Sequence, residues 1–457
     1  MSNILIQNGL LIDTEWKRRA DILISGSKII KIAPHINEEG AKIVHADGML
    51  VFPGLIDAHT HYHLISRGTV TADSFREGSR LAAFGGVTTV IDFADDDKKN
   101  LAQCSRDRIS AMSKEMSIDF SLHQGVYGYR ESLKEELEEL KKLGVGTIKL
   151  FTTYKNVGYL VENRDELKSI FSMCGELGLM ISIHCEDDKT IEEISNSWKG
   201  DFSPSSHPDL RPSIAEARAI EYVGSIALEA NVGLYIVHLS SKEGLEVVRS
   251  LRDRGLKIIV ETTPHYLFLD RSKLEGEFAS LYVMTPPLRT KEDNEALQEA
   301  LCNGEIQVVA SDHCAFTYEQ KLRSSDTRTI YPGIPGTEEI LPLIYSLVAQ
   351  GERLTVNELV NLLSTGPAKY FGLYPQKGVL REGSDADIVI FNPDYLWTLS
   401  RETTHSASLY TPYEGINVQG KAVMTYLRGR LIMGDNMYLG IDGDGRFVKA
   451  TRWLDYI

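Results

Sequence analysis

Residues 51–61 read VFPGLIDAHTH, an apolar segment that ends in an aspartate and two histidines. Similar apolar segments of strand length recur along the chain, and amphipathic stretches separate most of them. The expected strands are 51–57, 88–93, 119–126, 147–151, 180–185, 234–239, 257–263 and 307–311. Strands that alternate with helices over about 300 residues predict an α/β fold of the (β/α)8 TIM-barrel type. An open doubly wound sheet is the alternative, and the lack of a G-x-G-x-x-G after any strand weakens it.

The two ends of the chain differ in their sequence pattern from the middle. Residues 4–12, 20–33 and 41–52 are rich in Ile, Leu and Val and are broken by Asn-Gly, Ser-Gly and Asp-Gly pairs, which are typical of hairpin turns. A similar pattern returns after residue 375. Neither end is long enough to form a good core alone. We therefore expect residues 1–50 and 375–457 to pair into one small β-sandwich beside a barrel domain of residues 51–374.

Composition excludes several classes of protein. The chain has 64 Asp and Glu against 49 Lys and Arg, a formal charge of −15, which disfavours binding to nucleic acid or to anionic membranes. No apolar run approaches the roughly 20 residues that span a bilayer, and residues 1–13 do not resemble a secretory signal. The five cysteines are scattered and form no CxxC, which fits a reducing cytoplasm. We expect a cytoplasmic protein that binds neither nucleic acid nor membranes.

Polar side chains stand at the ends of several expected strands. His59 and His61 end the first strand, and His184, His238 and Asp312 end the fifth, sixth and eighth. Catalytic groups of barrel enzymes lie at these carboxyl ends, so the five side chains would converge on one mouth. Side chains two apart in a strand share a face, and two imidazoles on one face can bind a divalent metal. The pattern predicts a metal site.

Lys149 lies inside an apolar strand, between Ile148 and Leu150. An unpaired ammonium is costly there, so the lysine either reaches solvent, pairs with a carboxylate, or has a lowered pKa. In the last case the neutral amine can add carbon dioxide. The resulting carbamate is an anionic ligand that could bridge two metal ions, but position alone does not choose among these alternatives.

A series of segments resembles the signatures of the amidohydrolase superfamily, in the branch of cyclic-amide hydrolases that includes hydantoinases and dihydropyrimidinases. In chain order they are PGLIDAHTH (53–61), KLFTTYKN (149–156), IHCED (183–187), VHLSSKE (237–243), ETTPHYL (261–267), TPPLR (285–289) and SDHC (311–314). Residues 364–393 resemble the segment where the chain leaves the barrel for the small β-domain. The resemblance covers nearly the whole chain and implies the same two-part architecture.

The resemblance implies a binuclear metal enzyme, most often a zinc enzyme, and a homo-oligomer, either a tetramer or a dimer. A hydroxide that bridges the metals would attack a ring carbonyl, Tyr154 would stabilise the oxyanion, and Asp312 would serve as general base and acid. The product would be an N-carbamoyl amino acid. By position, the metal ligands would be His59, His61, carboxylated Lys149, His184, His238 and Asp312.

Substrate choice is less defined. Thr285 stands where relatives use a serine to hold the ring amide through its backbone, and His63 lies in the loop expected to shape the pocket for the exocyclic substituent. Dihydroorotases usually have an arginine at the position of His63, so that activity is disfavoured. Pro332 and Pro335 stand where relatives often have asparagine, and each proline removes a backbone donor. We expect a hydantoin with a bulky 5-substituent or, second, a dihydropyrimidine.

Three alternatives remain. An allantoinase is suggested by the form of ETTPHYL. A dihydropyrimidinase-related assembly protein would have lost metal ligands, whereas this chain keeps every ligand position. A nucleobase deaminase would use one metal and no bridging lysine. Other residues near the mouth are given lesser roles: Asp57 as partner of a ligand histidine, His265 and His313 as orienting groups, and Cys185 and Cys314 as ordinary thiols.

Overall fold

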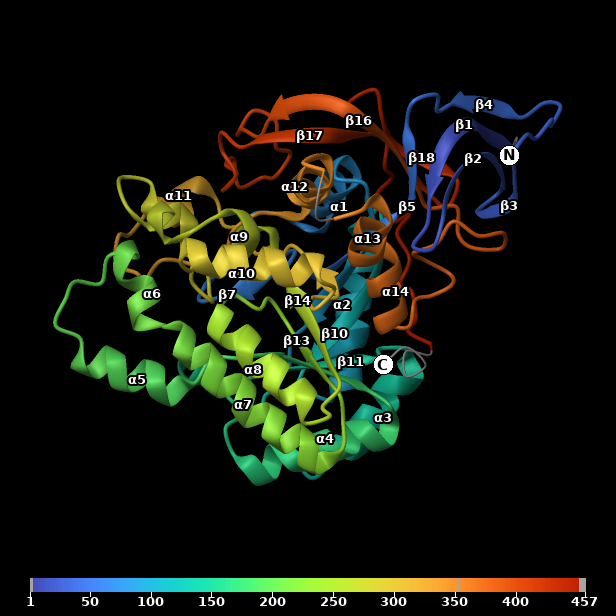
Figure 1. The fold of residues 1–457 in the computed structure, drawn as a ribbon. Helices are drawn as coiled ribbons and strands as arrows, with labels where there is room; N and C mark the ends of the chain where they lie inside the picture. Colours follow the sequence, from blue (N-terminus) through green and yellow to red (C-terminus); the bar gives the residue numbers. More distant parts are fainter. Residues whose placement is uncertain (1–2, 352–353, 452–457) are drawn as a thin grey trace.

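The computed structural model describes residues 3–351 and 354–451, and its central element is an eight-stranded parallel sheet that curves into a barrel (Figure 1). The strands follow one another around the sheet in chain order, each paired with the next. They are β6 (Leu55–Thr60), β9 (Val87–Ala94), β10 (Asp119–Gly125), β11 (Thr147–Phe151), β12 (Met180–His184), β13 (Leu234–Ile236), β14 (Ile258–Thr262) and β15 (Val308–Val309). The predicted barrel is confirmed.

The seam between the first and last strands is closed by the residues that follow β15. Thr60 and His313 form a parallel bridge, and the backbone N–H of His61 donates to the carbonyl of His313 at 2.8 Å. The backbone N–H of Ser311 donates to the carboxylate of Asp57 at 2.9 Å. The segment that carries Asp312 is therefore held directly against the end of β6.

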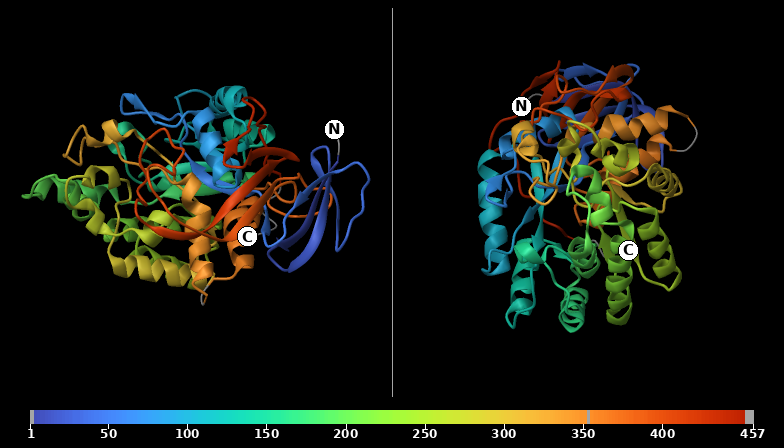
Figure 2. Two further views of the ribbon diagram at one scale, coloured as in Figure 1. Left: turned by 90° about the horizontal axis from the view of Figure 1, so that it is seen from above. Right: turned by 90° about the vertical axis from the view of Figure 1, so that its left-hand side faces the viewer.

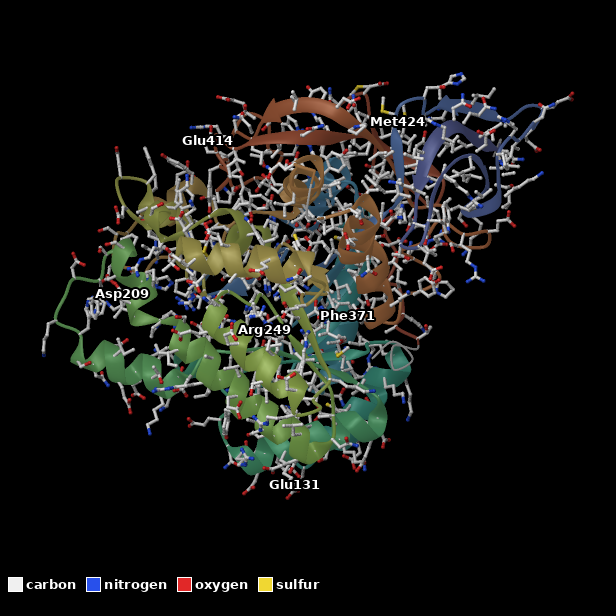
Figure 3. The ribbon with its side chains drawn as sticks, in the orientation of Figure 1. Glu131, Asp209, Arg249, Phe371, Glu414 and Met424 are labelled. Carbon is white, nitrogen blue, oxygen red and sulfur yellow. The ribbon has the colours of Figure 1, made fainter. Side chains whose placement is uncertain are left out.

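The inside of the barrel is filled by residues that alternate along the strands. Met180 on β12 and Tyr235 on β13 belong to one buried cluster, whereas their neighbours Ile181 and Leu234 pack into the larger core outside the sheet. Phe371, labelled in Figure 3, belongs to the same buried cluster, and its ring lies 5.0 Å from that of Tyr235. Polar side chains gather at the carboxyl end of the barrel strands.

Helices cover the outside of the barrel. They are α1 (Phe75–Phe84), α2 (Leu101–Glu115), α3 (Leu133–Leu143), α4 (Arg164–Leu177), α5 (Asp188–Ser197), α6 (His207–Leu210), α7 (Ser213–Ala230), α8 (Lys242–Asp253), α9 (Pro264–Phe268), α10 (Lys291–Cys302), α11 (Tyr318–Leu322), α12 (Ile340–Ala349), α13 (Val356–Val360) and α14 (Gly366–Tyr370). In α3, Leu133, Leu137 and Leu140 are buried at helical spacing, and Gly144 ends the helix with a φ of 98°. Most of the other side chains of this helix are solvated.

Strands from both ends of the chain form a second sheet that flanks the barrel (Figure 2). Its nine strands have the order β19-β18-β17-β16-β5-β1-β2-β3, and β4 also pairs with β1. The strands are β1 (Ile4–Ile12), β2 (Lys17–Ser25), β3 (Lys28–Ala33), β4 (Lys42–His45), β5 (Leu50–Pro53), β16 (Ile388–Thr398), β17 (Asn417–Leu427), β18 (Arg430–Gly434) and β19 (Met437–Tyr438). The predicted pairing of the two ends is confirmed. The domain limits stay a prediction, and residues 1–2 and 452–457 lie outside the described residues.

Two local predictions were wrong. The segment 51–57 is not one strand: β5 pairs with β1 and β16 in the flanking sheet, and β6 begins the barrel after Gly54. A Cβ at Gly54 would lie 2.2 Å from the Thr88 side chain, so only glycine fits where the chain passes from one sheet to the other. Asn8-Gly9 is not a hairpin turn but an irregularity inside β1, with Asn8 at a φ of 66° and its N–H donating to Asp21.

Candidate active site

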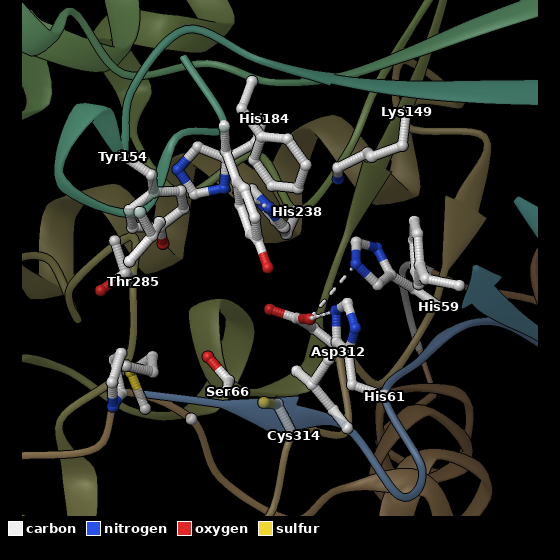
Figure 4. A pocket seen from close by; sticks show the side chains of 18 of the residues that line it. His59, His61, Ser66, Lys149, Tyr154, His184, His238, Thr285, Asp312 and Cys314 are labelled. Atoms are coloured by element: carbon white, nitrogen blue, oxygen red, sulfur yellow. Dashed lines mark hydrogen bonds and ion pairs between the residues drawn. The ribbon is translucent and has the colours of Figure 1, made fainter. Parts of the chain in front are cut away.

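The side chains predicted to bind metal meet at the carboxyl end of the barrel, around a cavity of about 120 Å³ (Figure 4). The cavity wall includes all six of them: His59, His61, Lys149, His184, His238 and Asp312. Tyr154 and Thr285 line the same cavity. The structure thus brings together every predicted site residue except His63.

His59 and His61 share one oxygen of Asp312. The Nε2 atoms of both imidazoles lie 3.3 Å from Asp312 Oδ1. Two donors bound tetrahedrally to one zinc ion at about 2.0–2.1 Å would be about 3.3 Å apart, so this spacing suits a shared cation. These three side chains are one of the two groups of acidic and histidine side chains in the described residues whose donor atoms are close enough to hold a metal ion. The other group, Asp119 with Asp385 and Asp387, already has cationic partners. The Lys377 ammonium pairs with all three, Arg428 pairs with Asp119, and Lys28 pairs with Asp385.

A register irregularity places the first two histidines. The pairing of β6 with β9 shifts between Asp57 and Thr60. Ile56 and Ala58 face the barrel interior, and the irregularity then re-aims His59 and His61 toward the mouth. The predicted common face of the H-x-H pair is observed, but it depends on this bulge as well as on the period of the strand.

His184 and His238 form a second pair. His184 Nδ1 lies 3.0 Å from His238 Nε2, so two ring nitrogens face each other inside the cavity. On its other side, His184 Nε2 lies 2.7 Å from Glu186 Oε2, and Arg211 clamps the same carboxylate through Nε and Nη2. His238 has a φ of 36°, which turns its side chain out of the strand pattern, and its Nδ1 has no hydrogen-bond partner among the described residues.

The Lys149 ammonium group points into the space between His59 and His238 (Figure 4). The residue is 1% exposed, and its Nζ has no hydrogen-bond partner in the part of the chain that the structure describes. It lies 5.3 Å from the ring centre of Phe93 and 5.2 Å from that of Phe151. Burial lowers the pKa of Lys149 to about 8, with the negative charges of Glu261 and Asp312 opposing the change. Neither solvent exposure nor a direct carboxylate pair accounts for this lysine.

Glu261 holds two histidines of the site in place through hydrogen bonds. Its Oε1 lies 2.8 Å from His59 Nδ1 and accepts the backbone N–H of His238 at 3.0 Å, and Tyr235 donates its hydroxyl to Oε2. Burial raises the pKa of Glu261 to about 8 against the hydrogen bond from Tyr235 and the charge of Lys149. Glu261 was not among the residues predicted from the sequence, although a lone acid in the apolar strand IIVET is the same signal that singled out Lys149.

Tyr154 stands at the rim of the cavity, opposite Asp312. It has a left-handed φ of 69°, and the Arg211 guanidinium lies 5.5 Å from its ring centre. Burial raises the pKa of the Tyr154 hydroxyl above its ordinary value, so it stays protonated and can donate a hydrogen bond. Thr285 lies beside it on the cavity wall (Figure 4).

The predicted pocket role of His63 does not match its position. His63 is exposed, has a φ of 48°, and packs its ring 5.4 Å from that of Phe75. Its backbone N–H donates to the carbonyl of Asp73, which fixes this turn. The cavity wall is formed instead by the next residues, Leu64, Ser66 and Arg67.

The supporting residues also differ in detail from the prediction. The carboxylate of Asp57 is not hydrogen-bonded to a histidine ring in the described residues: it accepts from Ser311, from Thr337 and weakly from the backbone N–H of His59. His313 lies behind the site, bound to Asp73 through Nε2 at 2.9 Å.

Other groups around the cavity were also given lesser roles from the sequence. His265 lines the cavity, and neither of its ring nitrogens has a hydrogen-bond partner within the described residues. Cys314 lines the cavity and Cys185 is buried, and burial raises the pKa of both thiols, which keeps them protonated.

The donor set tests whether the residues fit metal ions. Imidazole and carboxylate are the usual ligands of zinc and of related divalent ions. The unpartnered Nζ of Lys149 and the facing nitrogens of His184 and His238 are groups that a bound ion and its anionic ligand would satisfy. The residues therefore fit a metal centre.

The barrel and this set of donors define the class of metal-dependent barrel hydrolases. Comparison with known proteins agrees, because residues 50–432 match the model of the Amidohydrolase family. The chain belongs to this family, whose members are metal-dependent.

Named relatives resemble the chain over its whole length. It is 34% identical to the D-hydantoinase of Ralstonia pickettii, over 99% of each chain. It is 33% identical to a D-phenylhydantoinase of Escherichia coli, again over 99% of each. The crystal structure of dihydropyrimidinase from Brevibacillus agri superposes with a TM-score of 0.95 at 32% identity, covering 98% of this chain and 99% of that one.

Proposed function

We propose that the chain hydrolyses the ring C–N bond of a cyclic amide, a hydantoin or a dihydropyrimidine, to give an N-carbamoyl amino acid. The observation that carries this proposal is the pair His59 and His61 on one oxygen of Asp312, next to the buried and unpartnered Lys149. The relatives named as hydantoinases and dihydropyrimidinase support the choice of substrate class.

We propose the following metal ligands. His59, His61 and Asp312 would hold one divalent ion, and His184 and His238 would hold a second. Lys149, carboxylated by carbon dioxide, would lie between them, and zinc is the expected metal. When bound, the ions would lower the pKa of a water molecule toward about 7 and polarise the substrate carbonyl.

The chain's own residues then carry the remaining steps. The hydroxyl of Tyr154, kept protonated by burial, donates a hydrogen bond to the oxygen of the attacked carbonyl. Asp312 takes the proton of the attacking water and delivers it to the leaving ring nitrogen. The backbone of Thr285 is suited to hold the ring amide, because it lies beside Tyr154 on the wall of the cavity.

Other activities differ in what they require of the chain. A non-catalytic assembly protein has no need of the six convergent side chains, which this chain retains. A nucleobase deaminase with one metal leaves Lys149 without a role. An allantoinase shares the metal centre, and the form of the ETTPHYL segment (261–267) keeps allantoin among the substrates to test.

We also propose that the protein is cytoplasmic and forms a homotetramer or a homodimer. All five cysteines are free thiols in the structure, which agrees with a reducing compartment. Among the described residues, no helix is both long and apolar enough to cross a membrane.

A substrate panel tests the proposed function. Protein loaded with zinc or manganese is assayed on 5-substituted hydantoins, dihydrouracil, allantoin and dihydroorotate, and products are identified by mass. The proposal predicts turnover of hydantoins or dihydrouracil well above that of allantoin and dihydroorotate. If none of the four classes is hydrolysed, the assignment of substrate class is wrong.

A further inference from the structure

Arg67 stands at the tip of a short hairpin over the active site. The hairpin consists of β7 (Ile65–Ser66) and β8 (Thr69–Val70), and its two central residues, Arg67 and Gly68, have φ values of 49° and 76°. Two positive φ values are the pattern of a type I′ turn, which favours asparagine followed by glycine. Arginine is an unfavourable residue in this conformation, so a role of the Arg67 side chain would account for its presence.

The active-site cavity continues into a second cavity of about 590 Å³. Five residues line both spaces: Arg67, Tyr154, Val157, Thr285 and Pro332. Tyr154 and Thr285 are the residues proposed to hold the ring, so Arg67 lies where a substituent would leave the ring and enter the second cavity. Asp95 lines the first cavity but not the second, and its carboxylate accepts from Tyr127.

Arg67 is the cation of the second cavity that lacks a counter-charge. Lys155 lies 3.9 Å from Glu192, and Arg211 and Arg328 bind Glu186 and Asp326. No acidic group in residues 3–351 and 354–451 lies within ion-pair distance of Arg67. A guanidinium in this position can bind a carboxylate through two parallel hydrogen bonds.

We infer that the preferred substrate carries an anionic exocyclic substituent, of the carboxyalkyl type, which extends into the second cavity and binds Arg67. This inference rests on the proposed function and specifies its substrate class. Asp95 lines the first cavity and not the second, and an acidic group there disfavours an anionic substituent that stays in the first cavity.

The test compares two nearly isosteric substrates. These are 5-(2-carboxyethyl)hydantoin and its neutral amide, 5-(2-carbamoylethyl)hydantoin. The wild-type chain should hydrolyse the acid with a kcat/KM about tenfold higher, a factor that corresponds to about 1.4 kcal/mol. Arg67→Asn should lower this ratio about tenfold while suiting the turn, and the loss should lie mainly in KM because Arg67 is remote from the reacting bond.

Two further variants sharpen the comparison. Arg401→Asn removes an arginine from an exposed turn outside both cavities and should keep the wild-type ratio. Arg67→Glu should reverse the preference, toward 5-(4-aminobutyl)hydantoin, whose substituent is cationic.

The outcomes separate this inference from the proposed function. An acid-to-amide ratio near or below one in the wild-type chain, with both substrates hydrolysed, overturns the role of Arg67 and leaves the hydantoinase activity in place. An acid-to-amide ratio that is equal in Arg67→Asn and in the wild-type chain also overturns the role of Arg67. Absence of hydrolysis of every hydantoin overturns this inference, and absence of dihydrouracil hydrolysis as well overturns the proposed function.

Discussion

Glu261 Oε1 lies 2.8 Å from Nδ1 of His59, and both side chains are buried within the barrel mouth. A hydrogen-bond acceptor on Nδ1 fixes the imidazole as the tautomer whose Nε2 carries the lone pair, and that nitrogen faces Asp312. The same oxygen also accepts the backbone N–H of His238. One buried acid therefore orients a histidine from each of the two proposed metal sites.

Replacing this acid with its amide should weaken metal binding. Glu261→Gln keeps the size of the side chain but replaces one of its two acceptor oxygens with an amide that only donates, so His59 is held less firmly and zinc affinity should fall about 10–100-fold. Competition with a chromophoric chelator measures the affinity. Glu246→Gln, which removes an exposed acid paired with Arg249, should leave it unchanged. Equal affinities in all three proteins would show that Glu261 has no such role.

Asp312→Asn should abolish most of the turnover. An asparagine cannot take a proton from water, so kcat should fall about 10²–10⁴-fold on any hydantoin that the wild-type chain hydrolyses. Metal content is measured on the same sample, because Asp312 is also a proposed ligand. A variant with full metal content and turnover within tenfold of wild type would contradict the proton-transfer role.

Lys321 holds together the loops of the cavity wall. Its fully buried Nζ donates to the carbonyls of Val283, Tyr331 and Gly333 at 2.6, 2.9 and 3.0 Å. Lys321→Met should lower the free energy of unfolding by about 3–5 kcal/mol, because three buried carbonyls lose their donor. KM should rise as well, since Gly333 lines the cavity.

Urea unfolding and steady-state kinetics measure the two effects of Lys321→Met. Lys291→Met, an exposed lysine on α10, serves as the matched control and should change neither quantity. A Lys321→Met protein as stable as the control would show that these loops do not depend on Lys321.

Stability at acidic pH should depend on Glu136. A hydrogen bond from Arg130 lowers the pKa of Glu136 from 4.5 to about 2, with Ser132 and the N–H of Leu101 contributing. A carboxyl whose pKa is lower in the folded state stabilises the fold above its unfolded pKa and loses that contribution as pH falls. Wild type should therefore be more stable than Glu136→Gln at pH 6.

The difference between these two proteins should narrow by up to about 1.4 kcal/mol per pH unit between about 4.5 and 2. Unfolding by urea at a series of pH values measures this difference in the free energy of unfolding. A difference that stays constant over this range would exclude the titration of Glu136 as its cause.

The barrel could be predicted because its signals are local. Apolar strands and amphipathic helices alternate along the chain, and the inward alternation of Met180, Ser182 and His184 follows from the period of a strand. The break at Gly54 could not be predicted, because it depends on the side chain of Thr88 from another strand. The bulge at Asn8 likewise resembles a turn until Asp21 is seen to bind its N–H.

Within the site, the residues that the sequence reveals are polar groups at strand ends. The partners that orient them are set by tertiary contacts: Glu261 lies 202 positions from His59, and Arg211 lies 25 from Glu186. The exclusion of His63 from the cavity depends on the direction of one turn, which a positive φ and a backbone bond to Asp73 determine. Such contacts leave no periodic pattern in the sequence.

Metal content per chain tests the central claim most directly. Wild type and Lys149→Ala are loaded with zinc in bicarbonate buffer, desalted and analysed by elemental mass spectrometry. The proposed centre predicts about two ions per chain in wild type and at most about one in Lys149→Ala, with hydantoin hydrolysis lost in the variant. Two ions retained in Lys149→Ala, or about one ion in wild type, would contradict a lysine-bridged binuclear site.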